Sequence, residues 1–302
     1  MTAVLVEGRE LQLSNLDKVL YPQAGFTKGQ VINYYQRVAG ALLPHLEQRP
    51  LTLKRYPNGV EGHFFYEKRC PSYRPDWFKT AEVWSDRNRG IVNYCVVDDL
   101  PSLVWVANTA SLELHPSLSK CDEITRPTAV AFDLDPGAPA DMVDCARIGL
   151  RLRDLFSHMG LESFPKTSGS KGLQVYVPLN TPEATYEDGT KDFALSVARL
   201  FEKQFPDEVV HQMKKDLRPG KVLIDWSQND QHKTTVSVYS LRAKERPTVS
   251  TPLTWDEVET VVASRDPELV VFEADDVLER VDRLGDLFAP VATLQQELPA
   301  LT

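Results

Sequence analysis

Residues 128–137 read Thr128-Ala129-Val130-Ala131-Phe132-Asp133-Leu134-Asp135-Pro136-Gly137. The apolar first half predicts a buried β-strand, and the Pro-Gly pair predicts its end. Side chains alternate between the two faces of a strand, so Asp133 and Asp135 emerge together on one face. Two like charges held that close are unfavourable unless a divalent cation lies between them. Oxygen ligands suit Mg²⁺ or Mn²⁺, and paired ions of this kind serve phosphoryl transfer. An acid-rich turn without a metal is the alternative interpretation.

A second short strand ends in a third acid. The stretch Lys221-Val222-Leu223-Ile224-Asp225-Trp226 predicts a short β-rich run ending in an acid, and the turn residues Ser227-Gln228-Asn229-Asp230 follow it. Three carboxylates at two strand ends are an arrangement suited to nucleotidyl transfer. Asp225 is therefore the expected partner of the first two acids.

Between the two acidic segments lies a loop of small residues, Thr167-Ser168-Gly169-Ser170-Lys171-Gly172. Such residues let backbone N–H groups turn inward as an anion nest, to which the two serine hydroxyls add donors and Lys171 adds a positive charge. The loop lacks the Walker spacing of phosphate-binding loops. A tight hairpin turn is the alternative interpretation.

Four segments, in this order and at these separations, resemble the polymerase domain of bacterial DNA ligase D, in the archaeo-eukaryotic primase superfamily. They are Asp133 to Gly137, Ser168 to Gly172, Lys221 to Asn229 and Tyr239-Ser240-Leu241-Arg242. The resemblance extends over about residues 10–285. It implies an α+β primase-polymerase fold, with a mainly antiparallel central sheet flanked by helices and an N-terminal α/β subregion. We expect one such domain over residues 1–289 and a C-terminal tail over 290–302.

The same resemblance implies a template-dependent DNA/RNA polymerase that uses two Mn²⁺ or Mg²⁺ ions and nucleoside triphosphates, NTP or dNTP. Such enzymes prefer ribonucleotides, fill short gaps and extend broken ends in DNA repair by non-homologous end joining. Position by position, the catalytic and metal residues are expected to be Asp133, Asp135 and Asp225. The residues expected to contact the incoming nucleotide are His115, Ser168, Ser170, Lys171, Gln174 and Arg242.

One position departs from the family pattern. Gln174 stands where the family usually has a histidine, in the run Ser170-Lys171-Gly172-Leu173-Gln174. A glutamine amide can donate a hydrogen bond to a phosphate oxygen but cannot carry the positive charge of an imidazolium. The substitution therefore bears on nucleotide affinity and metal preference.

The N-terminal region places lysines at predicted helix starts. Thr27 and Gln30 form a capping box before an apolar stripe of helical spacing, which puts Lys28 in the first turn. Ser14 or Asn15 is similarly expected to cap a short helix that contains Lys18. A cation there opposes the helix dipole, unless an external anion binds. The resemblance matches Asn15, Lys18 and Lys28 to the pocket for the 5′-phosphate on the downstream side of a gap; two merely exposed lysines are the alternative.

Aromatic residues follow in a predicted strand, His63-Phe64-Phe65-Tyr66. Such a segment can pack in the core or offer a platform for a template base. The resemblance assigns template stacking to Phe64 and Phe65, and it likens residues 84–90 to the family's loop that engages the primer or the opposing DNA end. Two helices are also expected, at about 139–158 and 191–204.

Composition fits a protein of 302 residues, 42% of them hydrophobic, that can bury a large core. No apolar run of membrane-spanning length and no leader is found, so we expect a bacterial cytoplasmic, nucleoid-associated protein without a membrane partner. The net charge of −9 looks unsuited to DNA, but basic residues cluster locally. These clusters are Lys54-Arg55, Lys68-Arg69, Arg87-Asn88-Arg89 and Lys214-Lys215. The scattered cysteines (Cys70, Cys95, Cys121 and Cys145) are expected to be reduced thiols.

We therefore predict a stand-alone polymerase of the ligase D type. Its expected partners are gapped or broken double-stranded DNA with a 5′-phosphate, nucleoside triphosphates, a separate DNA ligase and an end-binding protein. Two alternatives remain. One is a primase that starts chains de novo, and the other is a catalytically silent DNA-end binding module, which the intact acids disfavour.

Overall fold

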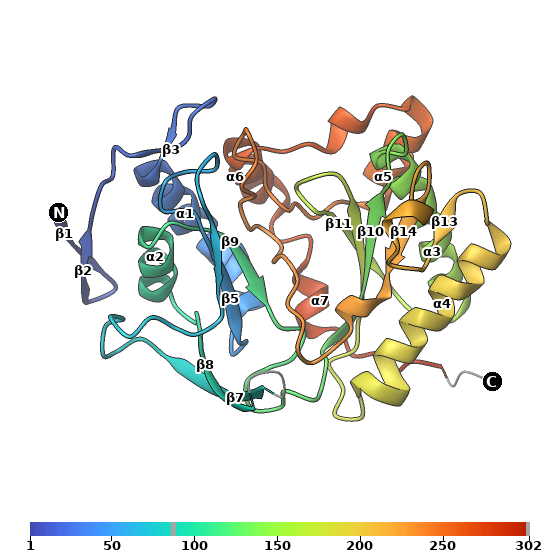
Figure 1. Ribbon diagram of the computed structural model, residues 1–302, viewed down its shortest axis with the longest axis horizontal. Coiled ribbons are helices and arrows are strands. Elements are labelled where there is room, and N and C mark those ends of the chain that lie inside the picture. Colours follow the sequence, from blue (N-terminus) through green and yellow to red (C-terminus); the bar gives the residue numbers. More distant parts are fainter. Residues whose placement is uncertain (86–88, 300–302) are drawn as a thin grey trace. The chain divides into compact units, whose positions relative to one another are not determined.

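In the computed structural model, which describes residues 1–85 and 89–299, the strand predicted at 128–137 is β10, Ala129–Pro136. It lies in the middle of a five-stranded sheet (Figure 1). The order of strands is β11 (Phe164–Thr167), β12 (Leu173–Pro178), β10, β14 (Val222–Asp225) and β13 (Val209–Val210). All neighbours are antiparallel except β13 and β14, which confirms the mainly antiparallel sheet.

The chain divides into two units. Unit 1 comprises Met1–Ile124, Thr234–Ser250 and Phe272–Asp286, and unit 2 comprises Thr125–Lys233, Thr251–Val271 and Leu287–Thr302. The sheet around β10 belongs to unit 2. The acids of the predicted metal site and the loop at 167–172 therefore share one unit.

The two predicted helices of unit 2 are confirmed as α3, Met142–His158, and α4, Lys191–Gln204. Phe132 of β10 contacts Phe156 of α3 and Phe193 of α4, with ring centroids 5.1 and 6.3 Å apart. Because Phe132 and Asp133 point to opposite faces, α3 and α4 cover the face of the sheet that does not carry the acids. Unit 2 also contains α5, Trp255–Ser264, and α7, Ala289–Thr293.

The predicted tail boundary at residue 290 falls inside α7. Beyond this helix, the side-chain amide of Gln296 donates hydrogen bonds to the carbonyl oxygens of Pro178 and Glu162, at 2.9 and 3.1 Å. Its backbone N–H donates to the carbonyl of Leu179. The chain is thus tied to unit 2 up to this point.

Unit 1 is an α/β region, as predicted for the N-terminal part. Its larger sheet contains β5 (Leu51–Arg55), β6 (Phe65–Glu67), β7 (Thr80–Ser85), β8 (Gly90–Cys95) and β9 (Ser111–Pro116). Two short hairpins precede it, β1 (Thr2–Val6) with β2 (Arg9–Leu13) and β3 (Val19–Tyr21) with β4 (Phe26–Thr27). The helices are α1 (Lys28–Leu46), α2 (Leu100–Asn108) and α6 (Ala274–Leu284).

The start of α1 is confirmed in detail. The Thr27 side chain accepts from the backbone N–H of Gln30, and the Gln30 side chain accepts from the N–H of Thr27. The first turn of α1 contains no acidic residue, so no carboxylate within that turn offsets the charge of Lys28 at the positive end of the helix dipole.

The short helix predicted around Lys18 is wrong. Asn15 has a left-handed φ of 52°, the N–H of Lys18 closes a turn on the carbonyl of Asn15, and β3 begins at the next residue. A turn followed at once by a strand leaves no room for a helical nucleus, which must fix several residues before it gains hydrogen bonds.

The expectation of four reduced thiols is also wrong in part. Cys70 and Cys95 form a disulfide, whereas Cys121 and Cys145 are free. The N–H of Cys70 donates to the carbonyl of Asn93, which brings Cys70 beside β8. A separation of 25 residues gives no local sign of this pairing.

In the parts of the chain that the structure describes, none of the helices combines the length and the apolar character needed to span a membrane.

Candidate functional site

The three predicted acids meet on one face of the sheet in unit 2. Asp133 on β10 lies directly opposite Asp225 on β14, and Asp135 follows two residues later on the same face. Directly opposed residues on neighbouring strands have Cβ atoms about 4.5–5.5 Å apart. The strand pairing therefore gathers carboxylates that are 92 positions apart in the sequence (225 minus 133).

The charge of Asp133 is poorly compensated. Burial, then the charge of Asp135 and that of Asp225, raise the pKa of Asp133 to about 7, while Gln174 and Lys166 act in the opposite direction. Within the described residues, no hydrogen bond reaches the buried Oδ1 atom of Asp133. An ionised Asp133 carboxylate therefore has one buried oxygen without a hydrogen bond, which is unfavourable for a buried charge.

Asp225 differs because its own turn holds it. Its Oδ1 accepts hydrogen bonds from the N–H and hydroxyl of Ser227 at 2.9 and 2.6 Å, and its Oδ2 accepts from the Gln228 amide at 2.9 Å. Among residues 1–85 and 89–299, no three His, Cys, Asp or Glu side chains are gathered as a ready metal cage. In the described structure, the Oδ2 atom of Asp225 accepts only the bond from Gln228, which leaves a lone pair there that a metal ion could take.

The line of polar side chains continues beyond the acids. On the other side of Asp133 lies Gln174 of β12, and opposite Gln174 lies Lys166 of β11. We call Lys166, Gln174, Asp133 and Asp225 the polar row. Lys166 is 1% exposed and was not identified from the sequence, because a single lysine in the short run Phe164 to Thr167 gives no signal of its partners.

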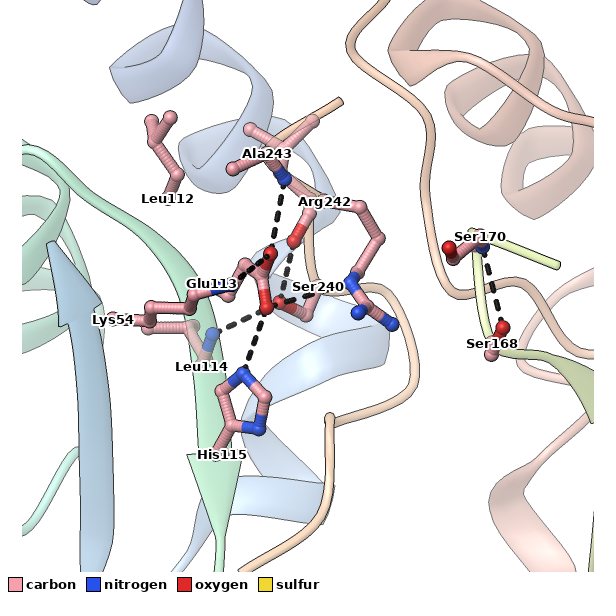
Figure 2. A network of polar contacts seen from close by, with 12 residues as sticks. Lys54, Leu112, Glu113, Leu114, His115, Ser168, Ser170, Ser240, Arg242 and Ala243 are labelled. Atoms are coloured by element: carbon pink, nitrogen blue, oxygen red, sulfur yellow. Dashed lines mark hydrogen bonds and ion pairs between the residues drawn. The ribbon is translucent and has the colours of Figure 1, made fainter. Parts of the chain in front are cut away.

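The loop at 167–172 is a tight hairpin connection between β11 and β12, which matches the alternative interpretation of its backbone. The N–H of Ser168 donates to the carbonyl of Gly172, and the N–H of Gly172 donates to the hydroxyl of Ser168. The N–H of Ser170 donates to the same hydroxyl (Figure 2). These N–H groups are therefore occupied within the loop. The exposed Ser170 and Lys171 remain as the groups that a phosphate could reach.

The loop packs closely against β10, which explains why residue 172 is a glycine. A Cβ atom on Gly172 would lie 2.2 Å from the carbonyl oxygen of Leu134, a distance that no side chain can adopt. The loop is thus held against the end of β10, next to the acids.

A second polar cluster, the Glu113 cluster, lies in unit 1 and contains two predicted site residues. The Glu113 carboxylate on β9 contacts His115 Nε2 at 2.9 Å, Lys54 Nζ at 3.3 Å and Arg242 Nε at 3.4 Å, and it accepts the N–H of Ala243 at 3.1 Å (Figure 2). The structure therefore brings His115 and Arg242 together around an acid that the sequence interpretation missed.

The electrostatics of the Glu113 cluster are balanced. Burial alone would raise the pKa of Glu113, but the hydrogen bond from His115 and the charges of Arg242, His115 and Lys54 outweigh it and hold this pKa well below its usual range. Burial lowers the pKa of His115, and Glu113 offsets this only in part. Glu113 stands between two buried leucines in a strand, and that break in the apolar run was the one available signal.

The residues predicted to bind a 5′-phosphate also lie close together in unit 1. The N–H of Lys28 donates to the carbonyl of Lys18 at 2.8 Å, and the turn of Asn15 precedes them. Lys28 is buried, and its Nζ donates to the Ser14 carbonyl at 2.6 Å, while the exposed Lys18 donates to Asn58 at 3.0 Å.

This lysine pair carries an excess of positive charge. Burial, followed by the charges of Lys18 and Arg55, lowers the pKa of Lys28 to about 8. The first N–H groups of α1, those of Lys28 and Gly29, are taken by backbone carbonyls, so they are not free for an anion as the sequence interpretation expected. Any anion here would be held by the ammonium groups.

The aromatic segment faces outward. Phe64, Phe65 and Tyr66 are 43%, 36% and 57% exposed, which excludes packing of all three in the core. Phe64 stacks on Tyr56 with ring centroids 5.2 Å apart, and Lys54 Nζ lies 4.6 Å from the Phe64 ring centroid. This arrangement is a supported platform with a cation beside it. Of the loop predicted at 84–90, residues 86–88 lie outside the described residues.

A family model and several known proteins match this chain, and all of them are named LigD. The family model described as the LigD primase-polymerase domain matches residues 27–288. The multifunctional non-homologous end joining protein LigD of Mycolicibacterium smegmatis is 42% identical over 283 residues, covering 93% of this chain and 36% of the relative. The bifunctional LigD of Bacillus subtilis is 33% identical over 276 residues, covering 91% of this chain and 43% of the relative. The chain thus spans less than half the length of these relatives.

A solved structure matches over nearly its whole length. The polymerase domain from Mycobacterium tuberculosis ligase D, determined in complex with DNA, has a TM-score of 0.86 and 38% identity. The match covers 95% of this chain and 99% of that chain.

Proposed function

Because this chain belongs to the LigD primase-polymerase domain family, a family of nucleotidyltransferase polymerases, we propose that it fills short gaps and extends ends during the repair of DNA breaks by non-homologous end joining. The observation that carries this proposal is the polar row of unit 2, where Asp133 and Asp225 lie opposite each other beside Asp135. A protein that merely bound DNA ends would gain nothing from the poorly compensated carboxylate of Asp133.

The acids fit an oxygen-ligated divalent cation in their chemistry. Carboxylate oxygens are the ligands that Mg²⁺ and Mn²⁺ prefer, and the unpartnered Oδ1 of Asp133 is such a ligand. Asp133, Asp135 and Asp225 would hold the two ions, which supply charge stabilisation and an activated primer hydroxyl when bound. The protein contributes the strand register that keeps the three carboxylates on one face.

We assign the nucleotide contacts to polar side chains that a triphosphate could reach. Lys171 and Ser170 at the hairpin tip are exposed and suit the triphosphate, with Ser168 shaping the turn beneath them. Gln174 adjoins Asp133 in the polar row. His115 and Arg242, held by Glu113, provide further contacts to the incoming nucleotide, for which we propose a preference for ribonucleotides.

The DNA contacts lie in unit 1. Lys18 and Lys28, with Asn15, form a site of excess positive charge that an external 5′-phosphate would relieve. Phe64 and Phe65 offer exposed rings on which a template base can stack. A gapped duplex with a downstream 5′-phosphate is therefore the proposed substrate.

Primer extension tests this function. The protein is incubated with gapped duplexes that carry or lack the 5′-phosphate, with ribo- or deoxyribonucleotides, and with Mn²⁺, Mg²⁺ or EDTA. We expect templated addition that requires the metal, is faster with the 5′-phosphate and favours ribonucleotides. Synthesis on a template without any primer would instead identify a primase, and DNA binding without addition under every condition would identify an end-binding module.

A further inference from the structure

The polar row ends in a buried cation. Lys166 on β11 faces Gln174 on β12, and Gln174 faces Asp133 on β10, so all three side chains lie on the acid face of the sheet. Lys166 is 1% exposed, and it is among the largest fully buried side chains of the described structure. Its Nζ lies 5.6 Å from the ring centroid of Tyr176, which adjoins it on the same sheet.

Burial makes the charge of this lysine effective at a distance. Solvent and salt screen exposed charges within about 10 Å, but they screen buried charges much less. The field of Lys166 reaches Asp133, where it opposes the effects of Asp135 and Asp225. The buried positive charge of Lys166 therefore acts on Asp133, which lies opposite Asp225 and two residues before Asp135.

We propose that Lys166 is a positioning residue whose fixed charge weakens the binding of divalent cations to Asp133, Asp135 and Asp225 in the absence of nucleotide. This inference rests on the proposed function, in which the three acids hold the metals. Three carboxylates carry three negative charges, and Lys166 offsets one of them. The remaining two charges match one divalent ion, so a second ion is held well only when a triphosphate adds negative charge.

A purely structural role for Lys166 makes the opposite prediction. If the lysine only supported the sheet, its loss would disturb the acid face and weaken metal binding. If its charge acts on the acids, its loss strengthens metal binding, because an opposing charge has been removed. The sign of the change therefore separates the two roles.

The test is calorimetric titration of Mn²⁺ into the full chain at pH 8 without nucleotide. Lys166→Met removes the charge at similar size, Lys166→Gln removes it but keeps a polar group, and Lys166→Arg keeps it. Lys203→Met, at an exposed position on α4 in the same unit, is the matched control for net charge. We expect Lys166→Met and Lys166→Gln to bind Mn²⁺ about 5–10-fold more tightly, and the other two variants to bind within about twofold of the parent.

Thermal unfolding in EDTA and in Mn²⁺ accompanies each titration, and the metal should raise Tm more in Lys166→Met than in the parent. Equal or weaker Mn²⁺ binding by folded Lys166→Met and Lys166→Gln would overturn the proposal. Asp133→Asn separates this failure from that of the proposed function. If Asp133→Asn loses Mn²⁺ binding while the Lys166 variants match the parent, only the role of Lys166 fails; if Asp133→Asn binds like the parent, the metal site itself is misplaced.

Discussion

Two acids in this protein, Glu113 of unit 1 and Asp133 of unit 2, have opposite surroundings. Glu113 contacts Lys54, His115 and Arg242, and these groups hold its pKa well below the usual range. Asp133 adjoins two other acids, and its pKa is raised to about 7. The first acid is satisfied by the protein, whereas the second lacks a positive partner of comparable strength.

From this difference we interpret Glu113 as an acid that supports its neighbours, and we propose Asp133 as an acid that binds the metal. A carboxylate whose charge is balanced by basic side chains gains little from binding a further cation. It acts instead by orienting those side chains. A carboxylate whose charge is not met gains most when a metal ion arrives. Groups whose pKa is strongly shifted are candidates for a functional role. The direction of the shift indicates whether a carboxylate is already paired within the protein or is available for a metal ion.

The largest expected effect is on catalysis, at the three acids of unit 2. We expect Asp133→Ala, Asp135→Ala and Asp225→Ala each to reduce nucleotide addition by about 10³-fold or more, because each removes a metal ligand. DNA affinity should stay within about twofold, since the acids do not contact DNA phosphates. Primer extension and DNA titration measure the two effects, with Asp154→Ala on the exposed side of α3 as the control. Parent-like extension by any of the three variants would reject the assignment.

The satisfied acid should matter most for stability. Glu113→Ala removes the carboxylate that three basic groups share, and breaking a buried pair in this way costs about 3–5 kcal/mol. Urea unfolding measures the free energy of unfolding, and Glu279→Ala at an exposed position of α6 should change it by about 0.5 kcal/mol or less. A loss as small as that of the control would mean that Glu113 is not the organiser of its cluster.

The pH dependence of stability should have opposite signs at the two acids. The pKa of Asp133 is about 7 in the folded state, above its unfolded value, so the metal-free parent loses stability as pH rises from 5 to 7. Asp133→Asn lacks this loss, and its stability relative to the parent should therefore grow by about 2–3 kcal/mol over that range. Glu113 has a lowered pKa and instead contributes stability above pH 5 that is lost on acidification. Unfolding in EDTA at several pH values checks this, and parallel curves for Asp133→Asn and the parent would contradict it.

The third site to test is the positively charged one in unit 1, formed by Lys18 and Lys28. Lys18→Ala with Lys28→Ala should remove the preference for gaps that bear a downstream 5′-phosphate, a loss of about 1–3 kcal/mol in binding. Affinities for phosphorylated and unphosphorylated gaps are compared in the double variant and in Lys79→Ala, a lysine of the same unit that pairs with Asp98. If the double variant still discriminates as the parent does, the pocket lies elsewhere.

The smallest expected effect concerns the neighbour of Asp133 in the polar row. Gln174→His should tighten nucleotide binding by about 1–2 kcal/mol or less, if an imidazolium at this position contacts the triphosphate. The gain should shrink as pH rises from 6 to 8, because the imidazole loses its charge in this range. The nucleotide KM of both proteins is measured across these pH values. An unchanged KM at every pH would mean that Gln174 does not contact the phosphates.

Much of the fold could be predicted because the relevant signals are local. The apolar run before Asp133, the apolar run before Asp225 and the capping box at Thr27 each set one element, and these elements form where expected. The failure around Lys18 has the same origin, since a capping residue was present but the chain turned into a strand before a helix could start.

The rest depends on contacts between distant segments. The burial of Lys166 and the disulfide between Cys70 and Cys95 depend on which distant segments come together, and no local pattern encodes this. Glu113 was missed for the same reason, because its partners Lys54 and Arg242 lie far away along the chain.

The central claim is that Asp133, Asp135 and Asp225 of unit 2 hold the metal, and anomalous diffraction tests it most directly. Crystals are soaked with Mn²⁺ and a non-reactive nucleoside triphosphate, and data are collected at the manganese edge. We expect an anomalous peak about 2.0–2.4 Å from carboxylate oxygens of Asp133 and Asp135, with Asp225 completing the site. A peak at Glu113, or full Mn²⁺ occupancy away from all three of these acids, would contradict the account.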